Sequence, residues 1–200
     1  ANFTGVTKEE AQDKCQNAQK TLISLNLESK IIDNPEEEKK YWTIRHESFN
    51  LLRKHSANMT SAPFIDDIIV RPEKLSKFLP KLKEILAQYK NSMLYTIAGH
   101  IGEGNFHIIP LLDLKNPEVR EKIMELFAKV NDLVLEFAGS LTAEHNDGVI
   151  RGPYLEKEFG PDMYQLFKEV KNIFDPKNIF NPHKKVDATF KYSFDHLNNS

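Results

Sequence analysis

Apolar side chains recur every three or four residues in three stretches of the chain, and this spacing predicts amphipathic helices. The stretches cover residues 75–86, 117–137 and 163–174. Asn116 and Pro117 have the residue types typical of an N-cap and a first helical position, and Gly139 is expected to end the second helix. Pro80 lies inside the first pattern and should kink that helix or divide it in two.

A fourth helix, with a less regular apolar stripe, is expected to run from Pro35 towards His55. Asn34 supplies its N-cap, and the charge run EEEKK fits a solvated first turn that the helix dipole favours. The residues before Pro35 are expected to form a helical connecting segment.

Short segments rich in β-branched residues predict strands between these helices. They cover residues 64–70, 93–98 and 106–112, and residues 140–143 are compatible with a fourth strand. The resulting order of strand, helix, strand, strand, helix, strand is the split βαβ arrangement. It predicts an α+β fold with a ferredoxin-like antiparallel sheet, helices packed mainly on one face, and flanking helices.

Composition narrows the class of partner. The 27 basic and 29 acidic residues give a net charge of -2, so no overall field draws the protein to nucleic acid or to an anionic membrane. The single cysteine, Cys15, cannot form an internal disulfide, and no apolar run reaches the roughly 18 residues of a membrane-spanning helix. The N-terminus lacks the features of a signal peptide, so a cytoplasmic location is expected.

Imidazole and carboxylate groups gather in two glycine-flanked segments. His100 and His107 bracket the segment HIGEGNFH at facing ends of the predicted hairpin, and Glu144 and His145 are adjacent in TAEHNDG. Two histidines and a carboxylate would provide three metal ligands and leave a position open for substrate or water. Ordinary hydrogen-bonded histidines are the alternative. Beside a cation, His145 would stay neutral and could act as a general base, and its alternative is a surface turn histidine.

These segments resemble the C-terminal domain of FAD-linked oxidases related to D-lactate dehydrogenase, the glycolate oxidase large subunit and D-2-hydroxyglutarate dehydrogenase. The resemblance covers about residues 35 to 186 and rests on motifs in a fixed order. The motifs are W-x-x-R in Trp42 to Arg45, DDIIVRP, H-x-G-(D/E)-G-N-x-H, G-(S/T)-x-(T/S)-(A/G)-E-H, and the closing FDP and NP segments.

The resemblance implies roles for the histidine cluster. His100, His107 and Glu144 would be the ligands of a divalent ion, zinc or manganese-like, that orients a 2-hydroxy acid. His145 would remove the hydroxyl proton while the α-hydrogen leaves as hydride to the flavin. Asn181 would approach the flavin edge.

Three further residues are implied as substrate contacts. Arg45 resembles the arginine that pairs with the substrate carboxylate, and the alternative is that Arg45, next to Trp42, only extends its side chain across the sheet. Asn105 would touch substrate or shape the hairpin. Arg151 would be an additional anion contact or a charge at a helix start.

Departures from the family pattern bear on the substrate. The chain reads E-H-N-D-G where many members read E-H-G-(I/V)-G, and His183 replaces the glycine of the usual N-P-G-K ending. Ile65 and Ile109 stand where the hydroxyglutarate enzymes place a lysine and an asparagine. Hydroxyglutarate is therefore disfavoured, and a D-lactate-like or glycolate-like acid is expected.

The expected organisation is a connecting segment at residues 1–34, a substrate (cap) domain at 35–186 and a tail at 187–200. The FAD-binding domain is expected to be absent from this chain, because no glycine-rich stretch could hold a dinucleotide and only 8 glycines occur. The chain alone is therefore expected to be inactive.

The resemblance also implies partners and alternatives. Electrons would pass to a quinone, an iron-sulfur protein or an electron-transfer flavoprotein, and such a partner leaves open a peripheral attachment to a membrane. One alternative is a flavoenzyme domain similar to alkylglycerone-phosphate synthase. The other is a non-catalytic accessory subunit with the same fold.

Overall fold

The computed structural model describes residues 2–55 and 59–196, and the chain divides into two compact units, residues 1–55 and 56–200. The first unit contains α1 (Lys8–Ser24) and α2 (Pro35–His55). The predicted cap is confirmed, because Asn34 Oδ1 accepts a hydrogen bond from the Glu36 amide at 2.9 Å.

The second unit is built on a small antiparallel sheet. Its strands are β1 (Thr60–Ser61), β2 (Ile68–Ile69), β3 (Leu94–His100) and β4 (Asn105–Leu112). β4 pairs with each of the other three strands, and Ser140 adds an isolated bridge to Ile69. The order of Ser140, β2, β4 and β3 across the sheet confirms the split arrangement and the α+β class.

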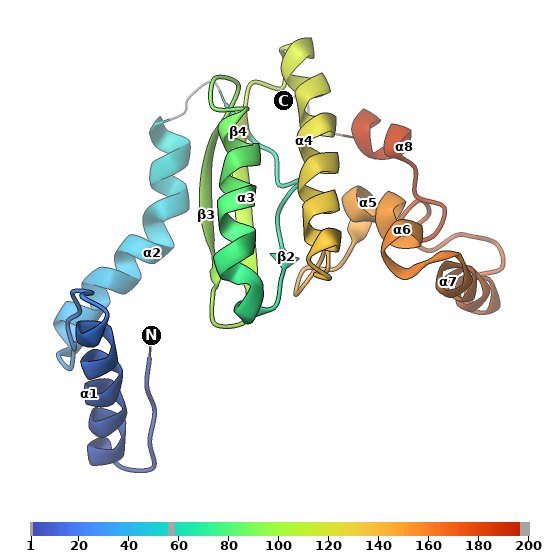
Figure 1. Ribbon diagram of the computed structural model, residues 1–200. Helices are drawn as coiled ribbons and strands as arrows, with labels where there is room; N and C mark the ends of the chain where they lie inside the picture. The colour runs from blue at the N-terminus through green and yellow to red at the C-terminus, as the bar shows by residue number, and fades with distance from the viewer. Residues whose placement is uncertain (1, 56–58, 197–200) are drawn as a thin grey trace. The chain divides into compact units, whose positions relative to one another are not determined.

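The helices of the second unit include two that cover one face of this sheet and others that continue beyond them on one side (Figure 1). They are the 3-10 turn η1 (Pro72–Lys74), α3 (Leu75–Ala87), α4 (Pro117–Glu136), α5 (Gly148–Arg151), the 3-10 turn η2 (Gly152–Tyr154), α6 (Leu155–Phe159), α7 (Pro161–Phe174) and α8 (Phe190–Asp195). α3 and α4 contact each other, and their apolar side chains share one core with Phe106 and Ile108 of β4. The Asn116 cap is confirmed, because its Oδ1 accepts from the Glu118 amide at 3.0 Å.

Three sequence expectations differ from the structure. The strand expected at residues 64–70 is limited to Ile68–Ile69, because Asp67 adopts a left-handed conformation with φ 66°. The strand at 140–143 is reduced to the single bridge of Ser140. α3 continues through Pro80 rather than dividing there, since the tertiary packing of its apolar face outweighs the loss of one hydrogen bond.

Two further observations complete the fold. The tail expected at residues 187–200 contains α8, and residues 197–200 lie outside the described part. None of the helices in the described ranges combines the length and the apolar composition needed to cross a membrane.

Candidate functional site

The β3–β4 hairpin positions the two predicted histidine ligands. The turn between the strands is closed by hydrogen bonds from the Glu103 amide to the His100 carbonyl and from the Gly104 amide to the Ile101 carbonyl. Gly104 has φ 76°, and a Cβ at this position would lie 1.8 Å from the Val70 carbonyl oxygen. Only glycine fits there, so the turn packs directly against the end of β2.

The histidines lie on the sheet face opposite the helices. His100 pairs with Asn105 across the hairpin, and His107 follows Asn105 by two residues, so the three side chains share a face. Phe106 and Ile108 project into the core on the other face. The site is therefore built on one side of a sheet whose opposite side is packed.

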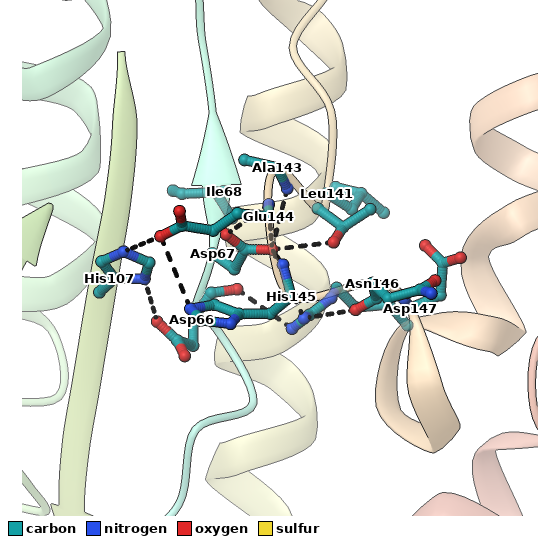
Figure 2. A network of polar contacts seen from close by, with 12 residues as sticks. Asp66, Asp67, Ile68, His107, Leu141, Ala143, Glu144, His145, Asn146 and Asp147 are labelled. Atoms are coloured by element: carbon teal, nitrogen blue, oxygen red, sulfur yellow. Dashed lines mark hydrogen bonds and ion pairs between the residues drawn. The ribbon is translucent and has the colours of Figure 1, made fainter. Parts of the chain in front are cut away.

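Asp67 holds the loop that carries Glu144 and His145. Its fully buried carboxylate accepts from the backbone amides of Ala143, Glu144 and His145 at 2.9 to 3.2 Å. It also accepts from the Thr142 hydroxyl at 2.8 Å. These amides face a carboxylate instead of a neighbouring strand, which fixes the direction in which the loop presents its side chains (Figure 2).

The electrostatics of Asp67 agree with this structural role. Burial by itself would raise the pKa of its carboxyl group, but the hydrogen bonds from His145, Ala143, Glu144 and Thr142 outweigh burial and lower the pKa to about 2. Asp67 is therefore an anion at neutral pH, and its charge is compensated by these fixed dipoles and by Arg151, whose Nη2 lies 3.8 Å from Asp67 Oδ2.

Glu144 stands at the centre of the three histidines. Its Oε1 lies 2.9 Å from His107 Nε2, 3.4 Å from His100 Nε2 and 3.7 Å from His145 Nε2. The imidazole ring centroids of His100 and His145 lie 5.8 and 5.1 Å from that of His107. The structure thus brings together all four residues of the predicted cluster, and a carboxylate oxygen is surrounded by three nitrogens.

Asp66 orients His107 from the side opposite Glu144. Asp66 Oδ1 lies 2.9 Å from His107 Nδ1, and the two side chains are 20% and 15% exposed. A carboxylate can only accept, so Nδ1 carries the proton of this hydrogen bond. In neutral His107 the Nε2 then has no proton, and two acceptors, Nε2 and Glu144 Oε1, face each other at 2.9 Å. Two acceptors at this distance need a proton or a metal ion between them.

The donor set fits a divalent ion. The ligand atoms of Asp67, His107, Glu144 and His145 lie within 4.8 Å of one another, a group that omits His100. Asp67 is the least suited of these four, because each of its oxygens already accepts at least two hydrogen bonds. Imidazole nitrogens with one carboxylate oxygen match the preferences of zinc and similar ions.

Asn105 and Arg151 are buried beside the cluster. Asn105 Nδ2 donates to Asp67 Oδ1 at 3.2 Å and to the Ile68 carbonyl at 3.1 Å. Arg151 donates to the carbonyls of Asp66 and Asn146 at 3.1 and 2.8 Å. These contacts join the hairpin, β2 and the loop, and the predicted contacts of Asn105 and Arg151 with substrate stay predictions.

The other two predicted residues belong to other segments of the chain. Arg45 is on α2 in the first unit, with its guanidinium carbon 5.5 Å from the centre of the Trp42 ring. Asn181 follows α7, has φ 48°, and lines the same cavity as His145. The role of Arg45 with a carboxylate and that of Asn181 with a flavin stay predictions.

The cavity shared by His145 and Asn181 has a volume of about 740 Å³. It lies between the loop at Asn146–Gly148, α6, α7 and the segment that follows α7. Pockets of this size accept whole small molecules.

Asp66 and Asp67 are the site residues that sequence reasoning missed. Both lie in the apolar segment FIDDIIV, which predicts a strand and overlaps the family motif DDIIVRP, but the sequence alone assigns neither carboxylate to the site. Two adjacent carboxylates in an apolar segment could have indicated these site residues. A buried carboxylate needs hydrogen-bond partners, and a specific site supplies them.

Several known proteins are similar to this chain in amino-acid sequence. D-2-hydroxyglutarate dehydrogenase of Haemophilus influenzae is 31% identical over 143 residues, which cover 72% of this chain and 14% of that protein. Glycolate oxidase subunit GlcD of Bacillus subtilis is 30% identical over 128 residues, covering 64% of this chain and 27% of that protein. The mitochondrial D-lactate dehydrogenase [cytochrome] of Arabidopsis thaliana is 31% identical over 158 residues, covering 77% and 26%.

The chain thus spans less than a third of the length of these three relatives. The family described as FAD linked oxidases, C-terminal domain, matches residues 1–185, which is nearly the whole chain. The protein therefore belongs to the family of C-terminal domains of FAD linked oxidases.

Proposed function

We propose that this chain is the substrate-binding and metal-binding domain of a flavin-dependent dehydrogenase that oxidises a 2-hydroxy acid to a 2-oxo acid. The observation that carries the proposal is the position of Glu144 Oε1, within 3.7 Å of the Nε2 atoms of three histidines. Family membership supports the flavin, and three relatives are named for the oxidation of such acids.

His100, His107 and Glu144 are the proposed ligands, and His145 is the proposed base. His145 suits this task because its side chain is 53% exposed and lines the cavity, while its backbone amide is fixed by Asp67. His107 suits the task of a ligand, because Asp66 on Nδ1 leaves the Nε2 lone pair directed at Glu144.

The proposed reaction needs two groups that the chain would bind or meet. A divalent ion would polarise the substrate hydroxyl, and FAD would accept a hydride from the α-carbon. His145 would take the hydroxyl proton, and the hydride would carry two electrons from the α-carbon to FAD, so that the carbon becomes a carbonyl. Arg45, Asn105 and Arg151 are proposed to contact the acid, and Asn181 the flavin edge.

The same proposal includes the partners of the domain. The FAD-binding domain would belong to the complete flavoenzyme, and a quinone, an iron-sulfur protein or an electron-transfer flavoprotein would receive the electrons. The proposed location is the cytoplasm, with attachment to a membrane only through such an electron-transfer partner.

Elemental analysis of the purified chain tests the ligand assignment. We expect about one zinc or manganese per chain in the wild type and in His46→Ala, a control histidine on α2, and little metal in His107→Ala. His145→Ala should retain the metal, whereas His100→Ala should lose most of it. Equal metal content in all variants, or loss in His145→Ala but not in His100→Ala, would overturn the assignment.

Binding of the acid completes the test. The metal-loaded chain should bind D-lactate or glycolate in calorimetry, and His107→Ala should not. A chain that holds metal but binds no 2-hydroxy acid would overturn the proposed substrate class.

A further inference from the structure

The cavity beside His145 has apolar walls. α6 contributes Leu155 and Phe159, and α7 contributes Phe167, Val170 and Phe174, with Phe180 on the segment that follows. Phe159 and Phe167 meet edge to face with their ring centroids 5.4 Å apart, and α6 packs on α7. These walls favour an apolar ligand group.

Most charged groups at this cavity are already paired. Lys171 Nζ binds the Asp175 carboxylate and donates to the Phe180 carbonyl at 2.5 Å. Lys185 Nζ lies 3.1 Å from the Asp147 carboxylate. Lys184 is the exception, since it is exposed and its side chain contacts Asn181 Oδ1 at 3.4 Å.

Asp175 gives these walls a fixed shape. Its carboxylate accepts from the Ile179 and Phe180 amides at 2.9 and 2.8 Å, which closes the segment after α7. The hydrogen bond from Lys171, followed by these amides, lowers the pKa of Asp175, so it remains an anion and keeps its partners at neutral pH.

His145 connects the cavity with the cluster. Its Nε2 is 3.7 Å from Glu144 Oε1, and the same residue forms part of the cavity wall. A hydroxyl held at His145 therefore lies between the cluster and the apolar walls. The rest of a substrate molecule can then extend over the loop at Asn146–Gly148 into the cavity.

We propose that the cavity is the subsite for the substrate side chain, and that it selects 2-hydroxy acids with an apolar side chain of several carbons. This inference rests on the proposed function and goes beyond it by naming the side chain. Val170, which is 54% exposed on α7, is the specificity-determining residue that is simplest to change, because it lines the cavity without a polar contact.

Calorimetry on the metal-loaded chain tests the subsite without flavin. The ligands are glycolate, lactate, 2-hydroxybutanoate, 2-hydroxyhexanoate and 2-hydroxyglutarate. We expect the affinity to rise by about threefold to fourfold for each added methylene, since burial of one is worth about 0.8 kcal/mol. Affinity should rise about 30-fold to 60-fold from lactate to 2-hydroxyhexanoate.

Two variants on α7 distinguish an effect of the cavity from an effect of the helix surface. Val170→Trp occupies part of the apolar wall space and should lower the affinity for 2-hydroxyhexanoate by about tenfold or more without changing that for glycolate. Ile173→Trp, at a position 73% exposed that does not line the cavity, should change neither affinity.

Each contrary outcome has a distinct meaning. Affinities that do not depend on side-chain length, or that Val170→Trp leaves unchanged, would overturn the subsite and assign the apolar walls to a contact with another part of the flavoenzyme. Tightest binding of 2-hydroxyglutarate would also overturn it and would assign Lys184 to a distal carboxylate. Failure of every acid to bind a metal-loaded chain would overturn the proposed function itself.

Discussion

Replacing Asp67 by asparagine is the sharpest single perturbation of the site. Asparagine has nearly the same shape and tolerates the left-handed conformation that Asp67 adopts at φ 66°. The substitution therefore removes the charge and one acceptor oxygen without adding backbone strain. The loop at residues 143–145 and Asn105 lose part of their shared partner.

The expected cost can be worked out from two contributions. Lowering the pKa from 3.8 to about 2 corresponds to about 2 kcal/mol of stability at neutral pH. In the variant, the side-chain nitrogen of the new asparagine replaces one carboxylate oxygen and faces donors such as the Glu144 backbone amide. A buried donor left without an acceptor costs about 1–3 kcal/mol. We expect Asp67→Asn to lower the free energy of unfolding by about 3–5 kcal/mol.

The pH dependence provides an independent check of the same reasoning. The folded-state pKa of Asp67 lies below its ordinary value. The contribution of Asp67 to the free energy of unfolding is therefore complete above about pH 4 and is lost as the pH falls towards 2. The difference in stability between wild type and Asp67→Asn should therefore narrow by more than 1 kcal/mol between pH 7 and pH 2.5.

Urea unfolding followed by circular dichroism measures both quantities. Asp113→Asn is a matched control, since the exposed Asp113 carboxylate accepts a hydrogen bond from the Lys115 amide at 3.1 Å. This substitution should change stability by less than about 0.5 kcal/mol. A loss below about 0.5 kcal/mol for Asp67→Asn at pH 7, or a loss that is equal at both pH values, would refute the anchoring role of Asp67.

Three other substitutions probe separate features. Asp66→Asn should weaken metal binding by about 10-fold to 100-fold in a competition with a chelator, with little change in stability, because it alters the hydrogen bond that orients His107; unchanged metal affinity would contradict this. Gly104→Ala should destabilise the chain by more than about 2 kcal/mol in thermal unfolding, because the new Cβ meets the Val70 carbonyl, and a neutral effect would count against the close packing. Asn116→Ala should cost about 1 kcal/mol through the lost cap of α4, and should leave metal content unchanged.

The parts of the fold that sequence predicts well are those determined by local pattern. The stripes of α3, α4 and α7 follow helical periodicity, and the caps at Asn34 and Asn116 form as their residue types indicate. The hairpin also follows, since its strands are β-rich and joined by a glycine-containing turn. The prediction that the histidine cluster assembles is confirmed by the distances around Glu144.

The parts that sequence did not predict depend on one long-range contact. Ala143 ends a segment that predicts a strand, but its amide and those of Glu144 and His145 bind the Asp67 carboxylate instead of a neighbouring strand. The same carboxylate requires the backbone turn that shortens β2. Periodicity measures local preference, so it carries no information about a partner 77 residues away.

That separation also determines when the site forms during folding. Glu144 and Asp67 are 77 residues apart, and α3, the hairpin and α4 lie between them. Closing so long a segment is entropically costly until the intervening elements have packed, so the contact is expected among the last to form. An ion that needs His107 and Glu144 together would then bind only chains that have completed folding, and the metal content of a preparation would report the fraction of correctly folded molecules.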